Sequence, residues 1–289
     1  MRSALFVPGD SERKLVKGLE AGADCLFVDL EDSVAPARKA TARDMAQDFL
    51  RAAREDAARP LLYVRVNALD TGLVEADLDA VMPARPDGIV LPKPRGGVDV
   101  QHLAAKLAVW EADHGIEGGA TWIICVATES AAAVFGLPTY AGASRRLAAL
   151  TWGAEDLSAD LGAETNRSPD GSFTNPYALA RTLTLLAAVA AGVQPMDSVY
   201  PNFRDETGFR AECEAARRDG FTAKMAIHPG QVPIINEVFT PPAHEVEQAR
   251  ALVAAFAAQP DAGVVSIGGE MFDRPHLERA RKLLKRAER

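Results

Sequence analysis

The chain has 289 residues, which is enough for one large α/β domain or two small ones. Its net charge of −8 argues against non-specific nucleic-acid binding, which depends on basic surface, and no apolar run reaches the roughly 20 residues that span a bilayer. With 48% hydrophobic and 25% charged residues, the composition is that of an ordinary soluble globular protein. We therefore expect neither a nucleic acid nor a membrane as a partner.

The three cysteines, Cys25, Cys125 and Cys213, are far apart in the sequence and lack the spacing of a metal site. This pattern indicates reduced, packed thiols. The first residues, MRSALFVPGD, lead directly into a predicted strand, and they show no signal-peptide pattern. We expect a cytoplasmic protein.

Short apolar runs alternate with longer helical stretches along most of the chain. Strands are predicted at residues 3–9, 25–32, 61–67, 88–93, 122–128, 147–153, 197–201 and 224–229. Helices are predicted at residues 11–22, 36–58, 74–82, 99–114, 175–191 and 206–218. Eight strand candidates that alternate with helices predict an α/β fold of the (β/α)₈ barrel type. A doubly wound sheet is the main alternative, but the GxGxxG turn typical of its first strand is not in this sequence.

The chain continues after the eighth predicted strand with a helix at 244–258, a short β-like run at 264–273 and a basic helix from Pro275. About 50 residues make a poor independent domain. We therefore divide the chain into a catalytic barrel, residues 1–238, and a C-terminal segment, residues 239–289. We expect this segment to pack on the barrel of its own or a neighbouring subunit.

Polar residues follow most of the predicted strands, where a (β/α)₈ barrel places its chemistry. They are Asp29, Glu31 and Asp32, Arg65 and Asn67, Lys93, Glu129, Glu155 and Asp156, and His228. Carboxylates at this rim suit Mg²⁺, which prefers oxygen ligands, whereas zinc would call for paired His or Cys residues. Glu129 and Asp156 are the candidate ligands. The alternative for both is helix capping at strand-to-helix turns.

Several motifs in a fixed order carry a family resemblance over almost the whole chain: LFVPGDSERK, VDLEDSV, VRVNA, LPK, ATES, WGAEDL and AIHPGQ. Together they resemble the citrate lyase β-subunit-like branch of the HpcH/HpaI aldolase superfamily, which includes malyl-CoA, β-methylmalyl-CoA and citramalyl-CoA lyases. The resemblance implies a Mg²⁺-dependent barrel, with Mn²⁺ as the alternative ion, that makes or breaks a C–C bond next to a CoA thioester. Glu129 and Asp156 then correspond to the metal ligands. Arg65 corresponds to the catalytic arginine that contacts the substrate's oxygens, and Glu129 also faces the substrate.

The tail motif GEMFDRPHLERA resembles the C-terminal segment of the CoA-ester lyases, in which the aspartate matching Asp273 is the acid/base. In those relatives the segment is a helical lid, often donated to a neighbouring subunit of a homotrimer or hexamer. From spacing alone, Asp273 followed by Arg274 and Pro275 is a helix N-cap. Both roles are compatible.

Other rim residues receive weaker assignments. Several relatives carry an arginine for CoA in the first turn, where this chain has Ser11, so Arg13 and Lys17 are the nearest candidates for the CoA phosphates. We expect Glu31, Asp32 and Glu155 to support the metal-bound waters or to form structural ion pairs, Glu155 because neighbouring residues of a strand point in opposite directions. Lys93, between two prolines, is left without a role. His228 is predicted to be structural.

The predicted reaction is cleavage or formation of a 3-hydroxy-dicarboxylyl-CoA, such as citramalyl-CoA or malyl-CoA, with acetyl-CoA and a 2-oxo acid (pyruvate or glyoxylate) as the other partners. One alternative keeps the site but hydrolyses malyl-CoA, as a thioesterase or after a condensation like that of malate synthase. Another is a citrate lyase subunit that acts only within a multi-subunit complex.

Overall fold

The computed structural model describes residues 1–288 and contains two compact units. The first unit spans Met1–Asn236, and the second begins at Glu237. The predicted boundary after residue 238 lies within the same helix, α9 (Val232–Phe239), as this division. Over residues 1–288, none of the helices is both long and apolar enough to cross a bilayer.

The first unit is a closed barrel of eight parallel strands in chain order, with β8 paired to β1, which confirms the predicted fold. The strands are β1 (Ser3–Pro8), β2 (Cys25–Asp29), β3 (Leu61–Arg65), β4 (Gly88–Leu91), β5 (Trp122–Val126), β6 (Leu147–Thr151), β7 (Gln194–Asp197) and β8 (Ala223–Ala226). Every residue of β2 and β4 is buried, as expected for parallel strands that are covered on both faces.

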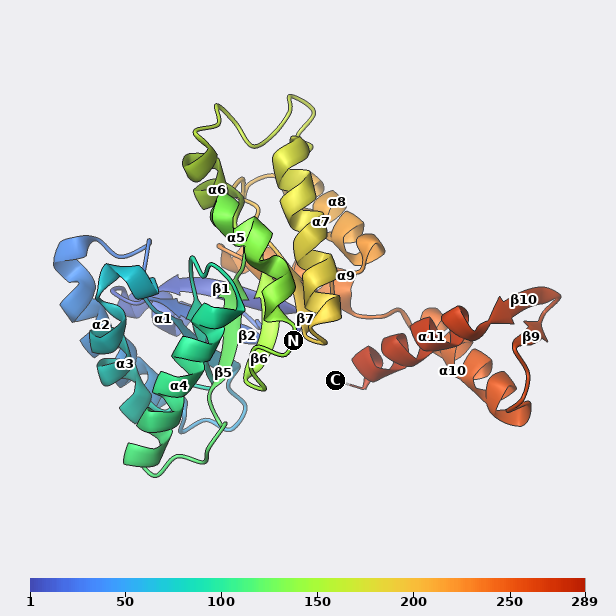
Figure 1. Cartoon of the computed structure of the whole chain (residues 1–289), viewed down its shortest axis with the longest axis horizontal. Helices are drawn as coiled ribbons and strands as arrows, with labels where there is room; N and C mark the ends of the chain where they lie inside the picture. Colours follow the sequence, from blue (N-terminus) through green and yellow to red (C-terminus); the bar gives the residue numbers. More distant parts are fainter. Residues whose placement is uncertain (289) are drawn as a thin grey trace. The chain divides into compact units, whose positions relative to one another are not determined.

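Helices surround the ring of strands (Figure 1). They are α1 (Glu12–Leu19), α2 (Lys39–Ala53), α3 (Val74–Val81), α4 (Gly97–Asp113), α5 (Ala131–Gly136), α6 (Ala154–Leu161), α7 (Asn175–Ala190) and α8 (Glu206–Asp219). Inside the ring, side chains from alternate strand positions form a continuous apolar core that includes Phe27, Tyr63, Ile124, Met196 and Met225. The interior is therefore filled, and ligands reach only its ends.

The seventh strand was predicted at 197–201 but lies at Gln194–Asp197. Pairing with β6 and β8 decides its position, because Pro195 lies beside Leu150 and Asp197 beside Lys224. Glutamine and proline have poor strand propensity, so the downstream Val199 and Tyr200 gave a misleading signal.

The other seven strands also end one to three residues earlier than predicted, and among them β2 ends at Asp29, β6 at Thr151 and β8 at Ala226. As a result, Glu155 and Asp156 do not continue β6 but lie in the first turn of α6. The strand argument for Glu155 is therefore wrong. The two carboxylates diverge because successive helical residues are rotated by about 100° around the axis.

The second unit has its own small core, in which α10 (Ala243–Ala258) packs against α11 (Arg274–Ala287). Between the helices lies an antiparallel hairpin of β9 (Val264–Ile267) and β10 (Glu270–Asp273), drawn in red in Figure 1. Its turn is Gly268-Gly269, with φ of 62° and 87°, as a two-residue hairpin loop requires. The β-like run of the sequence is therefore a hairpin that ends at the start of α11.

Candidate active site

The candidate site lies at the carboxyl ends of the barrel strands and is formed by a group of charged side chains, the rim cluster. Its members are Asp29, Glu31, Asp32, Arg65, Lys93, Glu129 and Asp156. They come from the ends of β2 and β3, the loops after β2, β4 and β5, and the first turn of α6. Five carboxylates and two cations leave a formal excess of three negative charges.

Arg65 is held in place by Asp29, because the last residues of β2 and β3 lie in register. Its Nε and one terminal nitrogen donate to the two Asp29 oxygens, each over 2.7 Å, and its other terminal nitrogen lies 3.0 Å from Glu31 Oε2. Burial would raise the pKa of Asp29, but the bonds from Arg65 outweigh it and hold that pKa below its usual range. Asp29 thus orients Arg65 as a bidentate partner.

Lys93 connects the acidic members of the cluster. Its Nζ lies 2.6 Å from Glu31, 3.2 Å from Asp32 and 3.1 Å from Asp156. Its backbone has a φ of 51°, which is uncommon for a residue other than glycine, and its N–H donates to Glu129 Oε2 over 2.5 Å. Partial burial would lower the pKa of Lys93, but the neighbouring carboxylates outweigh it and raise that pKa.

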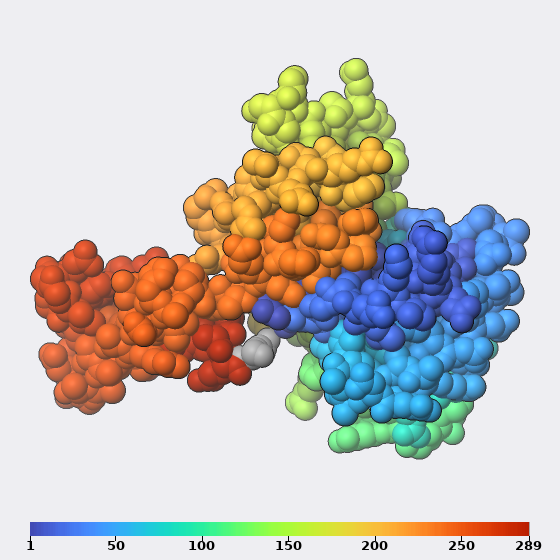
Figure 2. Space-filling model, turned by 180° about the vertical axis from the view of Figure 1, so that it is seen from behind, coloured from blue at the N-terminus to red at the C-terminus, as the bar shows by residue number. Residues whose placement is uncertain are grey.

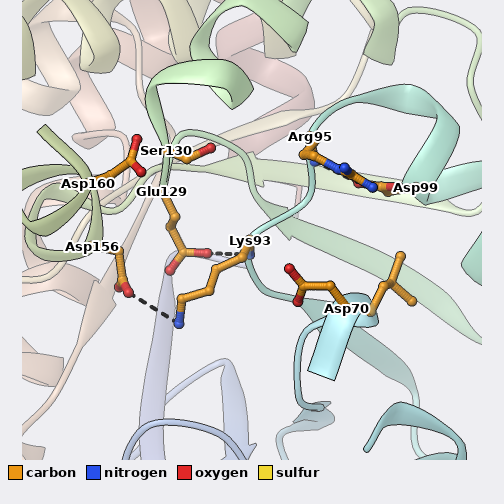
Figure 3. Close-up of a pocket in the computed structure, with 9 residues that line it drawn as sticks. Asp70, Lys93, Arg95, Asp99, Glu129, Ser130, Asp156 and Asp160 are labelled. Atoms are coloured by element: carbon orange, nitrogen blue, oxygen red, sulfur yellow. Dashed lines mark hydrogen bonds and ion pairs between the residues drawn. The ribbon is translucent and has the colours of Figure 1, made fainter. Parts of the chain in front are cut away.

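Glu129 is 5% exposed and lies against Gly153, where a Cβ would come within 2.8 Å of Glu129 Cγ. Figure 3 shows Glu129 and Asp156 near each other, with Glu129 joined to the backbone nitrogen of Lys93 and Asp156 to its Nζ. Burial raises the pKa of Glu129 well above its usual value, and the negative charges of Asp156 and Glu31 add to the effect. Burial likewise raises the pKa of Glu31. The cluster therefore holds more negative charge than its own cations neutralise.

The donor set fits a hard divalent cation. Glu129 and Asp156 offer carboxylate oxygens, and their mutual repulsion is the kind that a bound cation relieves. Within residues 1–288, no three His, Cys, Asp or Glu side chains are grouped so that they could enclose a metal ion. Two carboxylates with space for water suit Mg²⁺, which keeps several waters, better than a metal that is bound by protein groups alone.

Two cavities meet at the carboxylate pair, since Glu129 and Asp156 line both. One, of about 340 Å³, is polar and also exposes Lys93, Arg95 and Asp160 (Figure 3). The other, of about 330 Å³, contains Arg65 together with apolar side chains of the barrel mouth, including Phe6, Val126, Trp152 and Met225. The second cavity can hold a small acid with its charge on Arg65 and its carbon atoms on the apolar wall.

Comparison with known proteins gives a family for this arrangement. The family model described as HpcH/HpaI aldolase/citrate lyase matches residues 2–229. The chain is 35% identical to the citrate lyase subunit beta of Leuconostoc mesenteroides subsp. cremoris, over 99% of this chain and 93% of that protein. It is 36% identical to a (3S)-malyl-CoA thioesterase of Cereibacter sphaeroides, over 99% and 94%.

The chain belongs to the HpcH/HpaI aldolase/citrate lyase family. Among solved structures, it resembles protein CitE from Mycobacterium tuberculosis in complex with magnesium, acetoacetate and coenzyme A. The TM-score is 0.78 at 29% identity, and the match covers 100% of this chain and 98% of that one. The resemblance inferred from the motifs is thus confirmed, and the chain is an enzyme of a lyase family.

The remaining predicted residues of this family member lie outside the rim cluster. Arg13 and Lys17 are exposed on α1, in the blue N-terminal segment at the surface in Figure 2. Glu155 is exposed, lines the cavity of Arg65 and accepts a bond of 3.0 Å from Asn166. Asp273, in the second unit, is the N-cap of α11, and its carboxylate pairs with the His276 ring.

The sequence did not reveal two residues of the cluster as functional partners. Lys93 received no role, although the Pro-Lys-Pro run after a strand indicated a rigid turn that could aim a side chain. Asp29 was named only as a strand-end residue, and its bond to Arg65 follows from strand register. His228, which was predicted to be structural, accepts a bond from the Gly230 N–H and stacks on Phe203.

Proposed function

We propose that this chain is a Mg²⁺-dependent CoA-ester lyase. It would cleave or form the C–C bond of a 3-hydroxy-dicarboxylyl-CoA such as citramalyl-CoA or malyl-CoA, with acetyl-CoA and pyruvate or glyoxylate as the products of cleavage. The observation that carries the proposal is the repelling pair Glu129 and Asp156, which lines the same cavity as the oriented guanidinium of Arg65. The free, buried state of the three cysteines supports a reducing, cytoplasmic location.

Each half of the site has a distinct task in this reaction. Arg65 would bind the carboxylate of the 2-oxo acid half and stabilise oxygen charge, since Asp29 fixes its orientation before substrate arrives. Mg²⁺ held by Glu129 and Asp156 would supply a Lewis acid for the negative charge that develops on oxygen as the C–C bond breaks. Glu31, Asp32 and Glu155 would support the ion's waters. The apolar wall that includes Phe6 and Val126 would accommodate the carbon atoms, and a single methyl group there changes discrimination by about 1–3 kcal/mol.

The direct test compares Glu129→Gln and Asp156→Asn with wild type on malyl-CoA and citramalyl-CoA in Mg²⁺. We expect kcat/KM to fall about 10³-fold or more, which corresponds to roughly 4 kcal/mol of transition-state stabilisation. Asp44→Asn, an exposed carboxylate on α2, is the matched control. Wild-type rates in either site variant would contradict the proposed metal ligands.

Hydrolysis is the second candidate, because the (3S)-malyl-CoA thioesterase is as similar to this chain as the citrate lyase subunit is. Product analysis separates them: acetyl-CoA with a 2-oxo acid identifies a lyase, and free CoA with malate identifies a thioesterase. Turnover of free CoA esters by the purified chain would also distinguish it from a citrate lyase subunit that works only within a complex.

We propose that the C-terminal segment, residues 239–289, is a lid whose Asp273 protonates the α-carbon of the thioester enolate on cleavage, which gives acetyl-CoA, and removes that proton in the synthetic direction. We further propose that a homotrimer or hexamer donates each lid to a neighbouring subunit. Asp273→Asn keeps a good helix cap and should lower activity about 10²–10⁴-fold. Co-expression with Glu129→Gln chains should restore activity if the lid acts on a neighbour, and no restoration would contradict donation between subunits.

The CoA moiety is proposed to contact Arg13 and Lys17, which lie one helical turn apart on the exposed face of α1. Their contribution would be screened by salt. The KM for the CoA ester should therefore rise several-fold in an Arg13→Gln, Lys17→Gln double variant at low salt, with kcat unchanged.

A further inference from the structure

Trp152 lies between the end of β6 and the turn that carries the proposed metal ligand Asp156. Its side chain is fully buried and packs with Ala154 and Leu157 of α6. Gly153, the next residue, is the N-cap of α6 and lies against the Glu129 side chain. The indole therefore packs on the first turn of α6, and the residue that follows it lies against Glu129.

One edge of the indole is fixed by a buried carboxylate. Trp152 Nε1 donates to Asp197 Oδ1 over 2.8 Å, and Asp197, the last residue of β7, is 1% exposed. Lys224 Nζ lies 2.9 Å from the other Asp197 oxygen, and Arg181 Nε lies 3.1 Å from Oδ1. Burial would raise the pKa of Asp197, but Lys224 and Arg181 outweigh it and hold the carboxyl ionised. The acceptor for the indole N–H is thus a charged, fully bonded group.

The indole also contacts the loop between α6 and α7, which is drawn in yellow-green at the surface in Figures 1 and 2. Phe173 of this loop meets Trp152 edge to face, with ring centroids 4.9 Å apart. The guanidinium of Arg167 lies 3.9 Å from the Phe173 ring centroid, and Arg167 Nη2 donates to Glu212 Oε2 over 2.8 Å. Arg167 also donates to the carbonyl of Gly171, which closes the loop on itself.

These contacts form a closed path, which we name the contact ring, because Glu212 also accepts from Lys224 over 2.9 Å. Its members, in order, are Trp152, Asp197, Lys224, Glu212, Arg167 and Phe173. Two carboxylates and two cations balance within it, unlike the rim cluster. Lys224 is 0% exposed and lies on the helix-facing side of β8, because its neighbours Ala223 and Met225 belong to the barrel interior.

We propose that Trp152 is a positioning residue for the metal site and that the contact ring holds it in the orientation that brings Asp156 into line with Glu129. An ion pair of this kind costs desolvation that apolar packing would not, but its directed bonds fix one arrangement of the indole. The inference rests on the proposed function only in taking Glu129 and Asp156 as the Mg²⁺ ligands. It extends the site to the α6–α7 loop, which touches neither carboxylate.

The test measures Mg²⁺ binding directly, by calorimetry on the full-length chain, in variants that change the contact ring at three residues: Trp152, Phe173 and Arg167. Trp152→Phe removes the N–H donor and keeps an aromatic ring, whereas Phe173→Leu removes the edge-to-face contact from a half-buried loop residue. Groups that support metal ligands typically contribute 10–100-fold to metal affinity. We therefore expect each of these two variants to raise the Kd for Mg²⁺ about 10-fold or more. Arg167→Lys, which keeps the charge opposite Glu212, should restore most of the affinity that Arg167→Met loses.

The control is Arg146→Met, because Arg146 precedes the same strand, β6, at its other end and forms a similarly buried ion pair with Glu111. This variant should lose stability yet bind Mg²⁺ within twofold of wild type. The proposal is overturned if Trp152→Phe and Phe173→Leu bind Mg²⁺ as wild type does, if affinity falls equally in Arg146→Met, or if wild type binds no Mg²⁺. If the ring variants weaken Mg²⁺ binding but no CoA ester is cleaved, the contact ring stands and the lyase proposal fails.

Discussion

Three carboxylates at the amino ends of the barrel strands are paired with arginines, Asp24 with Arg2, Asp87 with Arg59 and Glu111 with Arg146. At the carboxyl ends, five carboxylates share Arg65 and Lys93. Arg146 donates two bonds of 2.6 Å to Glu111, which is 1% exposed and also accepts from two backbone N–H groups. These bonds outweigh burial and lower the pKa of Glu111 to about 2, while burial and like charges raise that of Glu129.

The difference separates a part of the barrel built for stability from one built for a ligand. In pairs such as Arg146 with Glu111, each charge is neutralised by a partner in the same chain. Such pairs therefore contribute to the stability of the fold and need no ligand. The rim cluster instead has three more carboxylates than cations, and burial and like charges raise the pKa of Glu129 within it. Four tests would break or sharpen this comparison: removal of Arg146, a fall in pH, removal of the Glu129 charge and addition of Mg²⁺.

Removing one partner of the complete pair should have the largest effect. Arg146→Met leaves Glu111 buried without its cation, which typically destabilises a protein by about 3–5 kcal/mol. Urea unfolding measures this loss, and kcat per folded molecule should be unchanged because the pair lies at the end of the barrel opposite the rim cluster. A variant as stable as wild type would show that the pair contributes nothing.

The pH dependence of the same pair should be nearly as large. Because the folded-state pKa of Glu111 is about 2 and its ordinary value is 4.5, its stabilisation is present above pH 4.5 and is lost as the pH falls toward 2. The whole loss would be about 3 kcal/mol. The stability difference between wild type and Glu111→Gln should therefore narrow from pH 5 to pH 3 in urea unfolding. A difference that stays constant over this range would contradict the lowered pKa.

The sequence predicted the barrel because its strands are short apolar runs whose burial on both faces needs no knowledge of the partner strand. It failed at β7, where Gln194 and Pro195 form a strand only because β6 and β8 pair with them. It also missed the start of α6, since Gly153 offers no side-chain cap to mark the change from strand to helix. Local propensity is a weak guide where pairing or packing decides the backbone.

The candidate site likewise contains residues that the sequence could identify and contacts that it could not. Arg65, Glu129 and Asp156 could be selected because each is a charged residue just after an apolar strand, and the family motifs added their roles. The contacts of Lys93 and Trp152 could not be predicted in this manner. Lys93 reaches from the loop after β4 to residues after β2 and in α6, and Trp152 depends on Asp197 of β7. Such contacts follow from closure of the barrel, which places distant segments side by side.

Neutralising Glu129 in the rim cluster should change stability less than either change to the Arg146–Glu111 pair, and it should raise stability rather than lower it. Glu129→Gln can still accept the Lys93 N–H, but it removes a buried negative charge beside Asp156. Since a raised carboxyl pKa costs folding free energy at neutral pH, the variant should be more stable than wild type in EDTA, by about 1 kcal/mol or less.

Adding Mg²⁺ should make wild type more stable than Glu129→Gln, because only a chain with both carboxylates gains free energy of unfolding from binding the ion. At ten times Kd, linkage stabilises wild type by about 1.4 kcal/mol, and Arg146→Met should gain the same amount from its lower baseline. Glu155→Gln, an exposed acid with Asn166 as its partner, should change the unfolding free energy by less than about 0.5 kcal/mol in either buffer.

If Glu129→Gln is instead less stable than wild type in EDTA, the negative charge at the rim is already neutralised within the chain, and the contrast between the two ends of the barrel does not hold.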